Sequence, residues 1–166
     1  MKAFLEGRRI GYAFRPELGH IALGLGLAVT LLDLMAWFGW GARDTNGFVV
    51  AGYWVVSATA VIAALAAITA FAESTDAAGE DRPLARLDLV AALVAVLLYA
   101  VSAVLRAGDQ GAAGASPAAV VSAFAGLIVL GVDGVIASTL YASREWQVLD
   151  EEDYEPRRHP KRRRAS

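Results

Sequence analysis

A long apolar run near the N-terminus limits what this chain can fold into more than any other feature. Residues 18–40 read LGHIALGLGLAVTLLDLMAWFGW, with Asp33 as the only acidic residue. About 20 consecutive apolar residues are enough to span the hydrocarbon core of a bilayer. A helix on the surface of a soluble protein keeps a polar face, and this stretch keeps none. The run therefore predicts a transmembrane helix.

The composition of the whole chain agrees with a membrane protein. Of its 166 residues, 57% are hydrophobic and 19% are charged, which is too apolar for an ordinary soluble domain. The length leaves room for one domain. The chain has no cysteine, which excludes disulfides, thiolate metal sites and cysteine nucleophiles. Its two histidines leave little material for a metal centre.

A basic segment precedes the first apolar run. It contains Lys2, Arg8, Arg9 and Arg15. A secretion signal also starts with basic residues, but its apolar core spans only about 7–15 residues and leads to a small-residue cleavage site. Here the run is longer and ends in aromatic residues. We therefore expect an uncleaved first helix after a cytoplasmic or interfacial segment over residues 1–16. That segment either lies along the membrane surface or forms a disordered leader.

Three more apolar segments follow, separated by polar loops. We expect a four-helix transmembrane domain over residues 17–143, with helices at 18–40, 48–72, 89–105 and 117–143. The tail, residues 144–166, has an acidic block, then a basic block, and almost no apolar content. Such a composition buries too little surface to fold, so we expect this tail to be disordered and cytoplasmic.

The positions of Lys and Arg predict the orientation of the helices. The N-terminal segment, the second loop and the tail are basic, whereas the first and third loops have one basic residue each, Arg43 and Arg106. Short loops rich in Lys and Arg stay in the cytoplasm. The predicted fold is therefore an all-α integral membrane protein. Its four transmembrane helices form an antiparallel bundle with both termini cytoplasmic.

Ionisable residues within or at the ends of these apolar segments are the candidate site residues. They are Asp33, Arg106, Asp133, His20 and Glu73. Charge that faces lipid is costly, so such residues usually pair or face the bundle interior. Asp33 and Arg106 lie at comparable depths on helix faces that carry small residues. We expect a structural ion pair between them, and the alternative is a proton or ion path through Asp33.

Asp133 and His20 have no predicted partner of opposite charge. For Asp133 we expect either a protonated acid or hydrogen bonds to hydroxyl groups of Ser57, Thr59 or Ser102. His20 lies close to the cytoplasmic interface, where we expect an exposed or hydrogen-bonded imidazole. A haem or metal bound by His20 needs a second ligand at the same depth, and the first helix offers none.

The first helix also carries a spaced motif. Pro16, His20, Gly24 and Asp33 occur at the spacings seen at the start of a bacterial four-helix membrane family named domain of unknown function 2231. Members of that family begin with His-Pro-x-x-x-His and Phe-Pro-x-Gly, and an Asp follows. The chain resembles this family over most of residues 15–142. Two positions differ, because Arg15 replaces the first His and Ala22 replaces the second Pro.

The resemblance implies a four-helix domain in the bacterial cytoplasmic membrane but no particular activity, because the family has no agreed one. The second helix closes in the acidic Glu73 and the third in Arg106, as in the family. Some relatives are joined to redox domains, which implies electron-transfer surroundings. The replacement of the first His by Arg15 removes one ligand that a histidine-ligated haem b would use.

Three functions are compatible with these features. The first is a non-catalytic scaffold or accessory membrane subunit, because the sequence has no nucleophile–base pair, phosphate loop or metal-ligand spacing. We therefore expect no enzyme activity, no metal or other cofactor and no nucleic-acid partner. The second is a small proton-coupled transporter or channel that uses Asp33 and Asp133. The third is a haem-binding redox subunit that uses His20 from two protomers.

The expected partners are the lipid bilayer and either further copies of the chain or other membrane subunits. The tail adds anionic lipid headgroups as a candidate partner, because clusters of 4–8 basic residues bind the inner leaflet. Alternatively, this basic block only fixes the topology. Its residues are Arg157, Arg158, Lys161, Arg162, Arg163 and Arg164.

Overall fold

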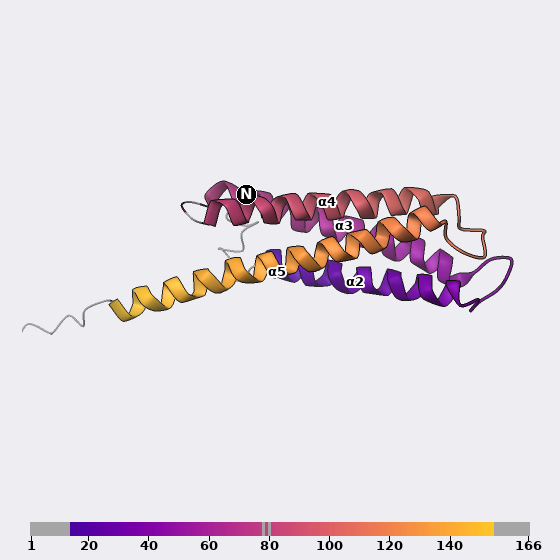
Figure 1. Ribbon diagram of the computed structural model, residues 1–166, viewed down its shortest axis with the longest axis horizontal. Coiled ribbons are helices and arrows are strands. Elements are labelled where there is room, and N and C mark those ends of the chain that lie inside the picture. The colour runs from indigo at the N-terminus through magenta and orange to yellow at the C-terminus, as the bar shows by residue number, and fades with distance from the viewer. Residues whose placement is uncertain (1–13, 78, 80, 155–166) are drawn as a thin grey trace, which may run out of the picture.

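The computed structural model describes residues 14–77, 79 and 81–154, and this part of the chain is all-helical. Each of its four helices contains a segment that is long and apolar enough to cross a membrane. The helices are α2 (Phe14–Trp37), α3 (Gly47–Asp76), α4 (Asp81–Ala107) and α5 (Pro117–Tyr154). They lie side by side in a bundle, and α5 continues well beyond the other three (Figure 1).

The helices form a closed ring, in which α2 contacts α3, α3 contacts α4, α4 contacts α5, and α5 contacts α2. The α2–α3 and α4–α5 connections lie together at one end of the bundle (Figure 1). Asn46 joins them, because its side-chain amide donates to the carbonyls of Trp40 (2.9 Å) and Ala113 (3.0 Å). Its side-chain oxygen also accepts from the backbone N–H of Phe48 and caps α3. The α3–α4 connection lies at the opposite end (Figure 1).

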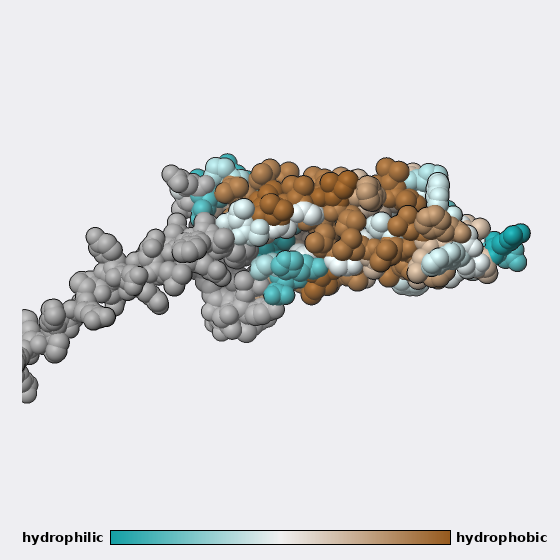
Figure 2. Space-filling view, turned by 60° about the horizontal axis from the view of Figure 1, so that its bottom comes forward, coloured by the Kyte–Doolittle hydropathy of each residue, from teal (hydrophilic) through white to brown (hydrophobic). Residues whose placement is uncertain are grey.

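Small residues fill the centre of the bundle, and large apolar residues cover its surface. The buried cluster contains Ala22, Ala63, Ala95 and Ala123 around the fully buried ring of Tyr99. Figure 2 shows a broad apolar belt over the helices with polar residues toward the ends. This distribution fits helices surrounded by lipid, where close approach of small residues replaces a hydrophobic drive for packing. Exposed members of the belt include Trp54, Leu97, Val104, Val121 and Val135.

The first helix starts and ends earlier than the sequence predicted. α2 begins at Phe14, so Arg15 and Pro16 lie in its first turn and not in a segment before it. Proline is tolerated there, because the first helical N–H groups have no partner within the helix. At the other end, Gly39 has a φ of 75°, a conformation that favours glycine and stops a helix after Trp37.

The other helices are also longer than predicted. α3 reaches Asp76 and α4 begins at Asp81, with Pro83 in its first turn. α5 reaches Tyr154, whereas the sequence predicts that the last helix ends at residue 143 and that a disordered tail follows. The segment SREWQVLDEEDY contains many good helix formers and neither glycine nor proline. Residues 1–13 of the predicted N-terminal segment and the basic block of the tail lie outside the described residues.

Candidate functional site

Two groups of buried ionisable residues lie near opposite ends of the bundle. One is the Asp33–Arg106 pair, near the end of α2 and the end of α4. The other is the Arg15 cluster, which consists of Arg15 from α2, Asp88 from α4 and Asp133 from α5. By formal charge the pair is neutral. The Arg15 cluster combines one guanidinium with two carboxylates and therefore has a net charge of −1.

The Asp33–Arg106 pair has two parallel hydrogen bonds. Arg106 donates from Nη1 to Oδ1 of Asp33 (2.7 Å) and from Nη2 to Oδ2 (2.6 Å). Such a bidentate arrangement fixes both the geometry and the partner. The structure thus contains the ion pair between the first and third predicted helices that the sequence led us to expect.

Neighbouring residues fit closely around this pair. Nε of Arg106 donates to Oγ of Ser102 (3.2 Å), which donates to the carbonyl of Ala119 on α5 (2.7 Å). On the α3 side, a Cβ added to Gly52 would lie 3.1 Å from Nη1 of Arg106, so glycine leaves room for the guanidinium. The arrangement ties α2, α4 and α5 together at this end of the bundle.

The Arg15 cluster brings the same three helices together near the other end. Arg15 donates to Asp88 from Nε (3.1 Å) and Nη2 (2.9 Å). Nη2 also lies 2.7 Å from both carboxylate oxygens of Asp133. All three side chains are buried. One guanidinium therefore holds two carboxylates that come from different helices.

The expectation that Asp133 has no basic partner is wrong. Arg15 precedes the predicted first helix at 18–40, so the sequence gives no reason to expect its side chain in the bundle interior. Asp88 likewise lies directly before the predicted third helix at 89–105. The hydroxyl groups proposed for Asp133 instead donate to backbone carbonyls. The donors are Ser57, Thr59 and Ser102, and the acceptors are Tyr53, Val55 and Ala119.

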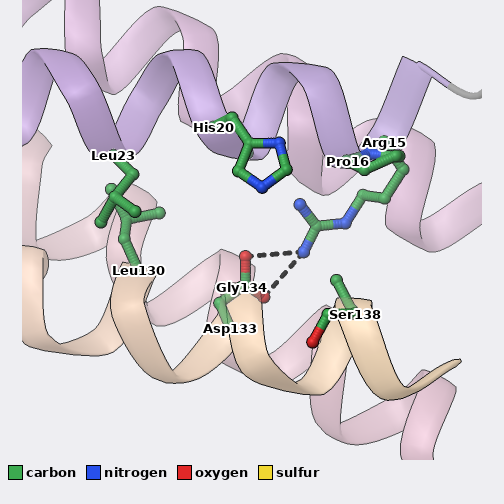
Figure 3. Close-up of a pocket in the computed structure, with 10 residues that line it drawn as sticks. Arg15, Pro16, His20, Leu23, Leu130, Asp133, Gly134 and Ser138 are labelled. Carbon is green, nitrogen blue, oxygen red and sulfur yellow. Dashed lines mark hydrogen bonds and ion pairs between the residues drawn. The ribbon is translucent and has the colours of Figure 1, made fainter. Parts of the chain in front are cut away.

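A pocket of about 200 Å³ lies between α2 and α5, beside the Arg15 cluster. We call it the α2–α5 pocket. Figure 3 shows the His20 imidazole and the Asp133 carboxylate on opposite sides of it, with Leu23 and Leu130 together at one end and Arg15 at the other. It is lined by Arg15, Pro16, Gly19, His20, Leu23, Leu130, Asp133, Gly134, Ala137 and Ser138.

The structure therefore places two of the predicted site residues, His20 and Asp133, at one pocket. His20 is exposed at its rim, while Asp133 is buried in its wall. The sequence did not predict this proximity, since the rotation of α2 against α5 decides which faces meet. Glu73 lies near the end of α3, where its carbonyl accepts the N–H of Ala77 (3.0 Å), and is not among the residues that line the pocket.

Among the described residues, no group of three or more His, Asp and Glu side chains could hold a metal ion. Comparison of the chain with protein-family models, curated proteins and solved structures finds no match. The two charge clusters and the α2–α5 pocket are therefore the features of the molecule that bear on its function.

Proposed function

We propose that this chain is an integral protein of the bacterial cytoplasmic membrane, an antiparallel four-helix bundle with both termini in the cytoplasm. Four helices of sufficient length and apolarity support membrane insertion. The basic N-terminal segment, α3–α4 connection and tail support the orientation. Arg15 and Arg106 contribute less to this rule than the sequence suggested, because both are held in ion pairs.

Reporter fusions test this topology. A periplasmic reporter fused after residue 45 or 112 should be active, and the same reporter fused after residue 78 or at the C-terminus should be inactive. An active C-terminal fusion would contradict both the number of spans and the orientation.

For its role we propose a non-catalytic scaffold or accessory membrane subunit. The Asp33–Arg106 pair carries this proposal, because a neutral, bidentate and buried pair holds helices together and leaves no free charge for chemistry. Such a bundle presents an apolar surface on which further membrane helices can pack. Purification from native membranes followed by light scattering tests it. We expect a particle whose protein mass exceeds the 17.5 kDa of one chain, and a monomer would contradict it.

A second function, a proton-coupled transporter, is favoured by the charge balance of the Arg15 cluster. Its net charge of −1 is buried beside a pocket, and uncompensated buried charge is costly. Binding of a proton or another cation restores neutrality. Asp133 is the candidate carrier, whereas Asp33 is already balanced by Arg106.

Proteoliposomes that contain a pH-sensitive dye test the second function. With an imposed potassium diffusion potential, we expect proton entry with the natural chain and no entry above the lipid background with Asp133→Asn. Asp44→Asn serves as the control, because Asp44 is exposed in the α2–α3 connection. Equal flux in both variants would contradict a carrier role for Asp133.

We also propose that the basic block of the tail binds anionic headgroups. The helical extension from Leu140 to Tyr154 is about 21 Å long at 1.5 Å per residue. Surface charge is screened within about 8–10 Å, so the extension must tilt or the following residues must turn back for contact. A peptide of residues 144–166 should bind anionic vesicles at low salt, detach as salt rises and ignore neutral vesicles. Equal binding to both vesicle types would contradict the proposal.

A further inference from the structure

We propose that the α2–α5 pocket binds a small amphiphilic organic monocation. The ammonium group would lie between His20 and Asp133, and the apolar body would lie against Leu23 and Leu130. This inference goes beyond the two functions proposed above, because it concerns occupancy of the pocket and not movement across the membrane.

The formal charge of the Arg15 cluster favours a cation over an anion; Arg15 and Asp133 line the pocket, and Asp88 lies behind them. Arg15 donates to Asp88 and Asp133 through Nε and Nη2, and the two carboxylates exceed its single positive charge. Both oxygens of Asp133 share the same donor atom, and a carboxylate oxygen accepts more than one hydrogen bond. An ammonium N–H can therefore bind Asp133 without displacing Arg15. An anion at this position would meet a net negative charge.

The imidazole of His20 supplies a second polar contact. It lies across the pocket from the Asp133 carboxylate, and the Arg15 guanidinium lies beside both groups (Figure 3). A neutral imidazole has one nitrogen that accepts a hydrogen bond. An ammonium group between His20 and Asp133 can donate a hydrogen bond to each of them. A neutral alcohol has a single O–H and can donate to only one.

The remaining walls are apolar and suit a small body. Leu23 and Leu130 close one end of the pocket. Gly19 and Gly134 also line it and have no side chain that would narrow it. A Cβ added to Gly134 meets nothing within 4 Å, so the space beside this residue is free. The pocket has a volume of about 200 Å³, which leaves room for a body larger than a single ion.

The direction of the pocket also matches the bilayer. Its charged end is at the start of α2, and its apolar end at Leu23 and Leu130 lies further along the bundle toward Tyr99, which packs over Gly26 and Gly126. His20 and Ser138 are exposed at the rim, so the pocket opens on the outer surface of the bundle. In the proposed orientation, an amphiphilic amine in the inner leaflet has the same order of charged and apolar parts.

Calorimetric titration of the full chain in lipid nanodiscs tests the inference. The probe is hexylammonium, the neutral comparison is hexan-1-ol, and titrations into empty nanodiscs are subtracted. We expect one equivalent of hexylammonium to bind at least about tenfold more tightly than hexan-1-ol. Equal affinity for the two probes would overturn the proposal, as would displacement of hexylammonium by an equal concentration of potassium chloride.

Two variants probe different parts of the pocket. Gly134→Leu fills it without changing a charge, and Gly131→Leu is the matched control, because Gly131 also has open space but does not line the pocket. Asp133→Asn removes the excess charge and leaves the Arg15–Asp88 pair balanced. We expect Gly134→Leu and Asp133→Asn each to weaken hexylammonium binding at least about tenfold, and Gly131→Leu to leave it unchanged. Natural affinity in Gly134→Leu would overturn the proposal, whereas binding without proton flux would contradict only the transporter function.

Discussion

The two charge clusters use the same chemistry but differ in their charge balance. In both, a buried arginine donates through Nε and Nη atoms and joins helices that are distant in sequence. Arg106 has one carboxylate partner, and neighbouring residues such as Gly52 pack closely against it. Arg15 has two carboxylate partners and a pocket beside them. The comparison indicates that a balanced group serves as a tie between helices. A group with excess charge can also bind a ligand.

Arg15→Gln should have the largest effect on stability. Removing one partner of a buried ion pair costs about 3–5 kcal/mol, and here two adjacent carboxylates lose the same cation. We expect a cost at or above the upper end of that range, seen as a lower thermal unfolding midpoint in detergent micelles. Arg43→Gln is the control, because Arg43 is exposed in the α2–α3 connection. Equal midpoints for the two variants would show that Arg15 does not hold the cluster together.

A double-mutant cycle examines the balanced pair. Asp33→Asn and Arg106→Gln should each lower the free energy of unfolding by about 3–5 kcal/mol, because each leaves a buried charge alone. In the double variant neither charge remains, so its loss should be clearly smaller than the sum of the single losses. The measurement is the free energy of unfolding in bicelles. Simple additivity would mean that the two residues do not interact.

Gly26→Ala should have an intermediate effect in the apolar region between the clusters. A Cβ at position 26 would overlap Oη of Tyr99, whose ring is fully buried. Overpacking of a filled core costs about 1–3 kcal/mol. Gly24→Ala is the matched control on the same helix, since nothing lies within 4 Å of its added Cβ. Thermal unfolding should separate the two variants, and equal midpoints would contradict the close contact.

Tyr99→Phe should have the smallest effect. The hydroxyl of Tyr99 is buried and has no hydrogen-bond partner among the described residues. Removing an unsatisfied polar group costs little and can stabilise a protein. We expect an unchanged or slightly higher unfolding midpoint. A clear decrease would show that the hydroxyl has a bonding partner.

The sequence was sufficient to predict the helical class and the Asp33–Arg106 pair. Hydropathy sets the number of long apolar segments, and both residues of the pair lie within or directly after such segments. The Arg15 cluster was not predictable by the same reasoning. Arg15 lies in the first turn of α2 and Asp88 about two turns into α4, in stretches that are too polar for hydropathy to assign to a span. Only their burial against Asp133 shows that they belong to the interior.

The α2–α5 pocket required three-dimensional information for a different reason. Its lining residues lie in two stretches, 15–23 and 130–138, that are more than 100 residues apart in sequence. The relative rotation of the two helices that carry them depends on packing throughout the bundle. Hydropathy predicts membrane spans and not whole helices, so it does not predict that α5 continues to Tyr154. The residues after 143 are too polar for a span but suitable for a helix in water.

The most direct test of the difference between the clusters compares Asp133→Asn with Asp33→Asn. Both variants remove one buried carboxylate and keep a similar shape. Asp133→Asn leaves Arg15 paired with Asp88 at zero net charge, whereas Asp33→Asn leaves Arg106 without a carboxylate. The free energy of unfolding in bicelles should therefore fall by about 3–5 kcal/mol for Asp33→Asn, and much less, or not at all, for Asp133→Asn. An equal or larger loss for Asp133→Asn would contradict the assignment of excess charge to the Arg15 cluster.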